Sequence, residues 1–302
     1  MGDIEIRVAR RKRMDGIFAI LGLVSTFVGM LTLAALMVDL AMDGSARLTQ
    51  TFFTSFPSRF PDQAGILSAW VGTTLVMLVT AATAVPLGVA AGVYLEEYAP
   101  SNWITALIEI NIANLAGVPS IVYGLMALGL FVYQFRLGQS ILSAGLTLAL
   151  LILPIVIVAT RESVRAVPGT MREAAYALGA TKWQTVKDHV LPYSTGGILT
   201  GVIIALSRAI GETAPLITIG ALTFIAFLPG PPLKAEFPFV SFEWLMSPFT
   251  VMPIQMFNWT SRPQHAFHLN AAAAGLVLMV MTLIMNGIAI YLRYRFRKRI
   301  RW

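Results

Sequence analysis

The residues best suited to chemistry in this sequence are an arginine and a glutamate, four positions apart in an apolar stretch. Arg208 and Glu212 lie in SRAIGETAPL, and the flanking runs 190–207 and 213–233 carry no charged residue. An arginine at the centre of a membrane helix costs about 2.5–3.5 kcal/mol on insertion scales, so it normally faces a protein interior or an aqueous path. Two explanations are open: a structural ion pair, or part of an anion pathway.

The chemistry of the pair is compatible with an anion pathway as well as with a structural ion pair. Arginine is always charged, and its planar fork matches an oxyanion such as phosphate. Glu212 would repel a bound anion, so we expect it to hold Arg208 between anion passages and to be displaced or partly protonated during one. Other polar residues complete the candidate pathway: Ser207, Thr213, Ser120 and Tyr123. For the last two, the competing explanation is packing between helices through small and polar residues.

A second segment has the pattern of a docking surface. Residues 161–192 read RESVRAVPGTMREAAYALGATKWQTVKDHVLP. Pro168 and Gly169 interrupt the preceding helix, and Gly179 stands where a left-handed residue ends a short helix. We therefore expect two short helices joined at Gly179, with a thin alanine-rich face able to enter a groove on another protein. The alternative is an amphipathic connector that lies on the membrane.

Helices that cross a membrane must position these residues. The chain has 302 residues, a mean hydropathy of +0.74 and only 12% charged residues, about half the charged fraction of a soluble domain. Its uncharged runs reach the roughly 20 residues that a bilayer requires, and they are too long for barrel strands. We predict an all-α polytopic protein with a six-helix transmembrane domain over 17–292. The expected spans are near 17–40, 68–95, 112–135, 140–160, 194–221 and 271–292, and Pro215 is expected to kink the fifth.

The basic residues indicate which side of the membrane each segment occupies. Of 22 lysines and arginines, five lie in the arm 1–16, five in 161–192 and six in the tail 293–302. Six spans put these segments on one side, which the positive-inside rule makes cytoplasmic, and we assign the net charge of +7 to this asymmetry and to anionic lipids rather than to nucleic acid. The segment 229–270 is then an ordered or partly re-entrant extracytoplasmic loop. The segment 96–111 fits less well, because it should be cytoplasmic yet carries only acidic charges.

The stretch EAAYALGATKWQTVKDHVLP resembles the EAA loop of ATP-binding cassette (ABC) importer permeases. The matching residues are Glu173, Ala174, Ala175, Gly179, Leu191 and Pro192. His189 departs from the pattern, because the family usually has an aliphatic residue two positions before Leu-Pro. Three further stretches, at 92–100 (GVYLEEYAP), 114–125 and 206–216, are similar to the A-type membrane subunits of phosphate-specific transport (Pst) systems. This resemblance covers residues from about 16 to 300.

The resemblance implies a type I importer fold and a permease subunit of an ATP-driven importer of inorganic phosphate, located in the inner membrane with both termini cytoplasmic. It also implies a set of partners. These are a second homologous permease that completes a heterodimer, two cytoplasmic ATPase subunits, an extracytoplasmic phosphate-binding protein and the lipid bilayer. The six matching residues of the EAA loop would then couple the permease to the ATPase.

The sequence agrees in kind with this assignment. It has no G-x-x-x-x-G-K-[ST] motif, so ATP must be bound by another subunit, and no hydrolase or metalloprotease motif that would make it an enzyme. It has no cysteine, and His265 and His268 lack neighbouring ligands, so we expect neither a metal nor a cofactor. Two alternatives stay open: an importer of another oxyanion (phosphonate, sulfate or molybdate), and an ion-coupled secondary anion transporter, whose inverted repeat is not visible here.

Overall fold

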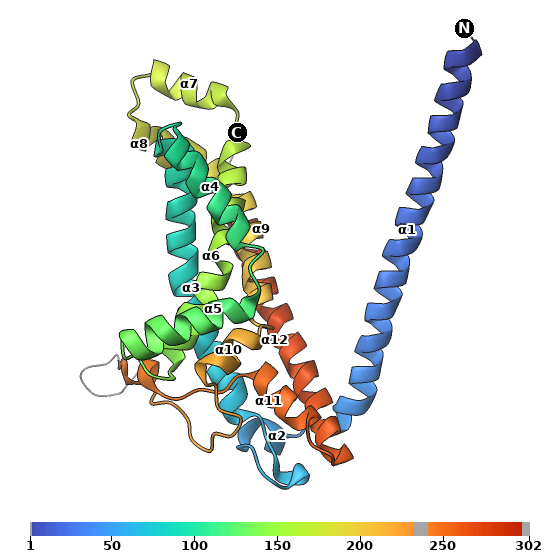
Figure 1. Ribbon diagram of the computed structural model, residues 1–302, viewed down its shortest axis with the longest axis vertical. Helices are drawn as coiled ribbons and strands as arrows, with labels where there is room; N and C mark the ends of the chain where they lie inside the picture. The colour runs from blue at the N-terminus through green and yellow to red at the C-terminus, as the bar shows by residue number, and fades with distance from the viewer. Residues whose placement is uncertain (1, 232–240, 298–302) are drawn as a thin grey trace.

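The computed structural model describes residues 2–231 and 241–297, and in these ranges the chain is helical and has no strand (Figure 1). Of the predictions above, those for residue 1, for 232–240 in the outer loop and for 298–302 in the tail lie outside the described residues. Five described helices are long and apolar enough to cross a membrane, and one bent pair raises the number to six. The all-α prediction is confirmed.

The five long helices are α1 (Gly2–Gly44), α3 (Leu67–Val93), α6 (Ile141–Arg165), the continuous run of α8 (Lys182–Thr185), η5 (Val186–Val190) and α9 (Leu191–Ala209), and α12 (His265–Arg297). The bent pair consists of α4 (Trp103–Leu115) and α5 (Ser120–Ala127), the latter extended by η4 (Leu128–Gln134). The shorter elements are η1 (Ser45–Arg47), α2 (Gln50–Thr54), η2 (Pro61–Gln63), η3 (Tyr94–Tyr98), α7 (Gly169–Ala177), α10 (Ala214–Ile219), η6 (Glu243–Met246) and α11 (Met252–Thr260).

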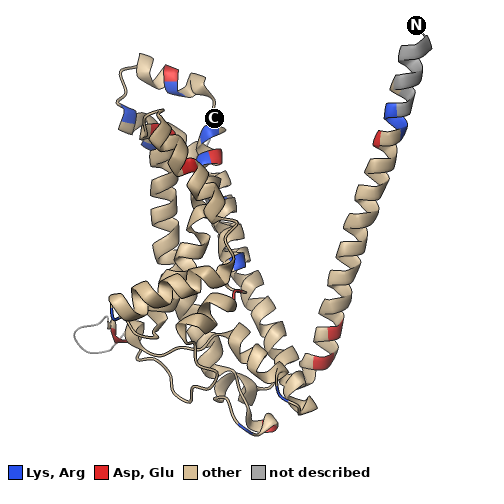
Figure 2. Ribbon diagram, in the orientation of Figure 1, with Lys and Arg blue, Asp and Glu red and all other residues tan. Residues whose placement is uncertain are grey.

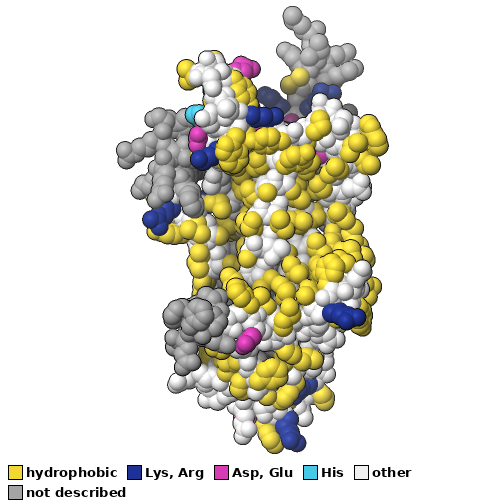
Figure 3. All heavy atoms as spheres, turned by 90° about the vertical axis from the view of Figure 1, so that its left-hand side faces the viewer, with side chains coloured by type: hydrophobic (Ala, Val, Ile, Leu, Met, Phe, Trp, Pro, Cys, Tyr) yellow, Lys and Arg dark blue, Asp and Glu magenta, His cyan; other side chains and the backbone are white. Residues whose placement is uncertain are grey.

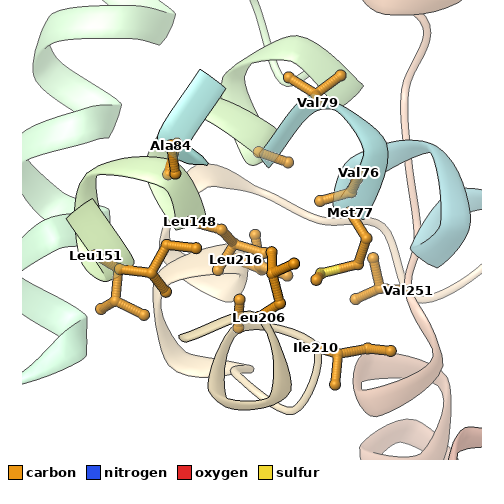
Figure 4. Packing of buried hydrophobic residues seen from close by; sticks show 14 of the residues in the cluster. Val76, Met77, Val79, Ala84, Leu148, Leu151, Leu206, Ile210, Leu216 and Val251 are labelled. Carbon is orange, nitrogen blue, oxygen red and sulfur yellow. The ribbon is translucent and has the colours of Figure 1, made fainter. Parts of the chain in front are cut away.

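The centre of the molecule is a layer in which α6 packs against α3 on one side and α9 on the other. Small residues let these helices approach closely. A Cβ atom on Gly145 of α6 would lie 2.4 Å from Val79 of α3, and one on Gly201 of α9 would lie 2.1 Å from Ala159 of α6. Without a hydrophobic driving force between helices in lipid, such close contact supplies the attraction that holds spans together. Figure 4 shows apolar side chains that fill the remaining space, among them Leu148, Leu206 and Leu216.

The first span stands apart from this layer. Helix α1 meets α12 only at one end, where Gly44 presses against the backbone of Ala273, and its apolar segment is not buried inside the described chain (Figure 1). The contact is fixed by Arg47, whose Nε donates to Asn270 Oδ1 at 2.7 Å and which also bonds the Pro61 carbonyl. Helix α1 therefore presents its apolar surface to the bilayer or to another chain.

The third span, predicted near 112–135, starts earlier than expected and is interrupted. Helix α4 ends at Leu115, α5 begins at Ser120, and the two are bent by 106°. The physical reason is Pro119, which lacks an N–H group for the helical ladder and disfavours helical geometry in the residue before it. In Figure 1, α4 runs obliquely across α6, which it contacts, whereas α5 lies crosswise below it.

The prediction for the fifth span at 194–221 is also wrong at both ends. The helix starts at Lys182 and runs through Pro192 without a break, so Pro192 does not separate the loop from the span. It ends at Ala209, and a separate short helix, α10, follows. Pro215 causes more than the expected kink, because it occupies the first turn of α10, where its missing N–H group is tolerated.

The two ends of the molecule differ in their content of charged residues. Figure 2 shows them gathered at the end that carries α7, with fewer at the opposite end, and Figure 3 shows apolar side chains over the middle of one face. The described parts of the basic arm and tail also belong to helices, since α1 starts at Gly2 and α12 reaches Arg297. At the opposite end, α11 packs against α3 and α12 and buries Trp259 completely.

Candidate functional site

The structure places Arg208 in the last turn of α9 and Glu212 just beyond the end of that helix. The pair forms as expected, with Arg208 Nε 3.2 Å from Glu212 Oε1. The side chain of Arg208 is 40% exposed and that of Glu212 is 18% exposed, so the arginine is the more accessible partner. Only one guanidinium nitrogen is used. The terminal Nη atoms have no hydrogen bond among the described residues and are therefore available to an anion.

The interruption of the fifth span places Glu212 in a backbone turn beside Arg208. The backbone turns after α9, where Gly211 and Glu212 donate to the carbonyls of Arg208 and Ala209. Irregular backbone at membrane depth is tolerated only where it is buried in protein or lines an aqueous cavity. The Glu212 side chain is 18% exposed, in a turn that lies between α9 and α10.

The interrupted third span meets the interrupted fifth one. Gly124 of α5 lies so close to α10 that a Cβ atom there would be 2.6 Å from Pro215 Cα. Tyr123 is buried and donates to the Leu115 carbonyl at 2.8 Å. Tyr123 thus links the start of α5 to the end of α4, and among the described residues no hydrogen bond joins Tyr123 or Ser120 to the ion pair.

The two hydroxyl candidates beside the pair differ in their contacts. Ser207 Oγ is shared between the Ile203 carbonyl and Asn286 Oδ1 of α12, each at 2.7 Å, so it links two spans rather than facing Arg208. Within the described ranges, Thr213 Oγ1 has one long contact, of 3.5 Å to the Gly211 carbonyl, and Thr213 is half-buried next to Glu212. Thr213 is the better placed of the two to assist an anion.

A cavity of about 860 Å³ lies nearby between α3, α9 and α12, but its chemistry does not suit an anion. Its walls are almost entirely apolar and include Leu206, Ile210 and Met281. Arg208 does not line it. Since an anion needs hydrogen-bond donors or positive charge, the Arg208 region and not this cavity is the candidate substrate site.

The segment 161–192 forms the expected helix–glycine–helix unit at the charged end of the molecule (Figure 1). Gly179 has φ +82°, the left-handed geometry expected at that position. Ala175 faces inward and is buried, whereas Glu173 and Ala174 are exposed. Leu178 is 90% exposed, and Leu191 and Pro192 are half-buried within the continuous helix. Tyr176 and Trp183 are exposed on the same segment, so it presents several large apolar side chains, as surfaces that another protein covers often do.

Comparison with known proteins agrees with this arrangement. Residues 84–302 match the family model described as binding-protein-dependent transport system inner membrane component. The chain belongs to this family. As a member it is a multi-pass membrane component of an ABC transporter and not an enzyme, and it works with separate ATPase subunits and a permease partner.

Relatives of known name lie within the same family. The phosphate transport system permease protein PstA of Yersinia pestis is 31% identical over 287 residues, which cover 93% of this chain and 90% of that protein. PstA 1 of Mycobacterium tuberculosis (strain CDC 1551 / Oshkosh) is 31% identical over 236 residues, 78% of this chain and 73% of that one. A solved bacterial ABC transporter involved in import of the polysaccharide alginate superposes with a TM-score of 0.58 at 14% identity, over 96% of this chain and 99% of that chain. This last likeness shows the fold alone.

Sequence reasoning missed two sets of residues in this permease. Asn286, a lone amide in an apolar span, contacts Ser207 beside the ion pair. The acidic residues of 96–111 pair with arginines of 161–192. A signal for the second set was present in the sequence, because two segments expected on the same side of the membrane carried opposite charges.

Proposed function

We propose that this chain is a permease subunit of an ATP-driven importer of inorganic phosphate and that it forms half of the translocation pathway. Two relatives that match most of the chain are named for phosphate transport, which supports phosphate over the other oxyanions. Arg208 carries the proposal. It is the charged fork at the junction of two interrupted spans, and its terminal nitrogens have no hydrogen-bond partner among the described residues.

One arginine balances only part of the charge of a divalent anion. A matching cation from the permease partner would supply the rest, so the complete site would lie between the two subunits of a heterodimer. In this scheme Glu212 occupies Arg208 when no anion is present, Thr213 adds a hydroxyl donor, and Tyr123 and Ser120 line the approach. Ser207 contributes by fixing α9 to α12 through Asn286.

The opposite functional surface is the segment 161–192. We assign Glu173, Ala174 and Gly179 to docking of a cytoplasmic ATPase, with Leu178 as an apolar anchor. Ala175, Leu191 and Pro192 shape the segment from within. Two ATPase subunits would serve the heterodimer, and an extracytoplasmic phosphate-binding protein would deliver the anion near 229–270. Both termini are then cytoplasmic, in line with the described ends of α1 and α12 and the charged end of the molecule.

The test is uptake of radiolabelled phosphate by proteoliposomes that contain the complete complex, at equal amounts of assembled protein. Arg208→Lys keeps the charge but loses the fork, and Arg208→Ala loses both. Loss of a hydrogen bond to a charged group is worth about 1.5–3 kcal/mol, so we expect uptake to fall by about 10- to 100-fold in Arg208→Ala. The matched control is Arg59→Lys, at an exposed position outside the site.

Wild-type uptake by Arg208→Ala would reject the anion pathway. Substrate choice is read from competition: unlabelled phosphate should block uptake, whereas sulfate, molybdate or a phosphonate should not. If one of those anions blocked uptake more strongly than phosphate, that anion would be assigned as the substrate, and the permease assignment would stand.

A further inference from the structure

The turn η3 (Tyr94–Tyr98), which closes α3 at the charged end, lies against the segment that we assign to ATPase docking. It is a π-helical turn, a form that is often found at functional positions. Its Glu97 accepts two hydrogen bonds from Arg172 of α7, from Nε at 3.0 Å and Nη2 at 2.6 Å. Only 6% of the Glu97 side chain is exposed.

Arg172 binds a third element at the same time. Its Nη1 donates to the Val167 carbonyl at 2.8 Å, and its Nη2 donates to the Val164 carbonyl at 3.0 Å. These carbonyls lie at the C-terminal end of α6, where a cation is favoured by the unpaired carbonyls and the helix dipole. One guanidinium group therefore joins α7, the end of α6 and, through Glu97, the end of α3.

Two further contacts join the docking segment to the end of α3 and to η3. Met171 of α7 packs against an apolar cluster of Val164, Val167 and Val190, which Val93 at the end of α3 also contacts. The Lys182 ammonium of α8 lies 5.1 Å from the centre of the Tyr98 ring, within cation–π range. Both short helices of the segment are thus attached to η3, while its other carboxylate, Glu96, pairs with arginines of α6.

We propose that Glu97 is the positioning residue through which the docking segment acts on α3. A buried carboxylate cannot leave its arginine without a large loss of free energy, so α7 and η3 move as one unit. Helix α3 then carries that motion through the layer formed with α6 to its far end, where Thr73 Oγ1 accepts from the Met252 amide of α11 at 2.9 Å. This inference rests on the proposed docking of an ATPase at 161–192.

The first test compares ATP hydrolysis with phosphate import in the reconstituted complete complex. Glu97→Gln keeps the shape and removes the charge, Glu97→Asp keeps the charge, and Arg172→Lys loses the fork. Glu162→Gln is the control, because that carboxylate is 62% exposed and, among the described residues, forms an ion pair only with Arg165 of its own helix. We expect phosphate imported per ATP to fall about 2- to 30-fold in Glu97→Gln, the range seen for residues that modulate coupling, to recover in part in Glu97→Asp and to stay unchanged in the control.

The second test follows the motion itself and does not depend on the substrate. The chain has no cysteine, so a nitroxide can be attached at Thr170→Cys in the docking segment, away from the residues assigned to ATPase contact, or at Leu87→Cys on α3, both exposed. ATP should alter both spectra in the wild-type background, but only the Thr170→Cys spectrum when Glu97→Gln is added. Arg172→Lys serves as the second background if Glu97→Gln does not assemble.

The outcomes separate the two proposals. An ATP response at both labels together with no phosphate import in the wild-type complex would reject the substrate assignment only. An ATP response at Leu87→Cys that survives Glu97→Gln, with an unchanged ratio of phosphate to ATP, would overturn the role of Glu97 only. If Glu97→Gln and Arg172→Lys both lost assembled complex while the remaining complex kept a normal ratio of phosphate to ATP, the ion pair would be only a structural contact. That result would also overturn the role of Glu97.

Discussion

Replacing Glu212 by glutamine separates a substrate site from a structural ion pair. Glutamine keeps the size of the side chain and a hydrogen-bonding oxygen, but it removes the charge that competes with an anion for Arg208. If Glu212 is the competitor, Glu212→Gln complexes should assemble in normal amounts and bind phosphate more tightly. If the pair only stabilises the fold, the complex should become less abundant and its phosphate affinity should not change.

The geometry sets the size of the effect. Arg208 Nε and Glu212 Oε1 are 3.2 Å apart, and the two side chains are 40% and 18% exposed. At an effective dielectric constant of about 20, unit charges at that distance attract by about 5 kcal/mol. Partial exposure and the cost of ordering both side chains reduce the net value toward the roughly 1 kcal/mol measured for exposed pairs. Glu212→Gln removes both the attraction of Glu212 for Arg208 and the repulsion between Glu212 and phosphate. Together these two changes amount to about 1–2 kcal/mol, or about 5- to 30-fold in phosphate affinity.

The assay is equilibrium binding of labelled phosphate to the purified complex without ATP, followed by uptake in vesicles. Tighter binding slows release, so the maximal import rate should fall while the Kd for phosphate decreases. Asp62→Asn is the control, because it makes the same chemical change at a carboxylate that is 94% exposed. An unchanged Kd in Glu212→Gln, together with a reduced amount of complex, would refute the competition between Glu212 and phosphate.

Three other predictions follow from single features of the fold. Gly124→Val should destabilise the complex by about 1–3 kcal/mol, because any Cβ there collides with Pro215; a melting temperature equal to wild type would contradict the packing of α5 on α10. Leu178→Ser should weaken co-purification of the ATPase while the permease stays in the membrane, and full recovery of the ATPase would remove Leu178 from the docking surface. A reporter after Trp302 should read as cytoplasmic and one inserted at Pro231 as extracytoplasmic, and the same reading at both sites would overturn the orientation.

Much of the site was accessible from sequence because its signals are local. An arginine four residues before a glutamate in an uncharged run indicates an ion pair, and that pair forms at 3.2 Å. A glycine after an alanine-rich turn of helix indicates a left-handed stop, and Gly179 adopts φ +82°. Both inferences depend on neighbours within about one helical turn, where chain geometry leaves few alternatives.

The interruptions of the spans were harder to place. Pro119 and Pro215 each indicate that the helix is disturbed nearby. A proline in a membrane helix either kinks the helix or ends it. Which of the two occurs depends on neighbouring helices, because they can satisfy the freed backbone groups. Here α5 and α10 pack on each other around Gly124, so both spans break. Hydropathy alone cannot distinguish a broken span from a straight one, because both are equally apolar.

Composition, charge asymmetry and local motifs thus determine that the chain is a helical membrane protein with an exposed loop and a charged pair inside an apolar segment. Two contacts depend on the tertiary structure alone: the hydrogen bond of Ser207 to Asn286 and the ion pair of Arg172 with Glu97. Each joins residues about 75 or more positions apart in the chain. No periodicity encodes such a pairing, since it arises only when close packing of small residues brings separate spans to the same depth in the membrane.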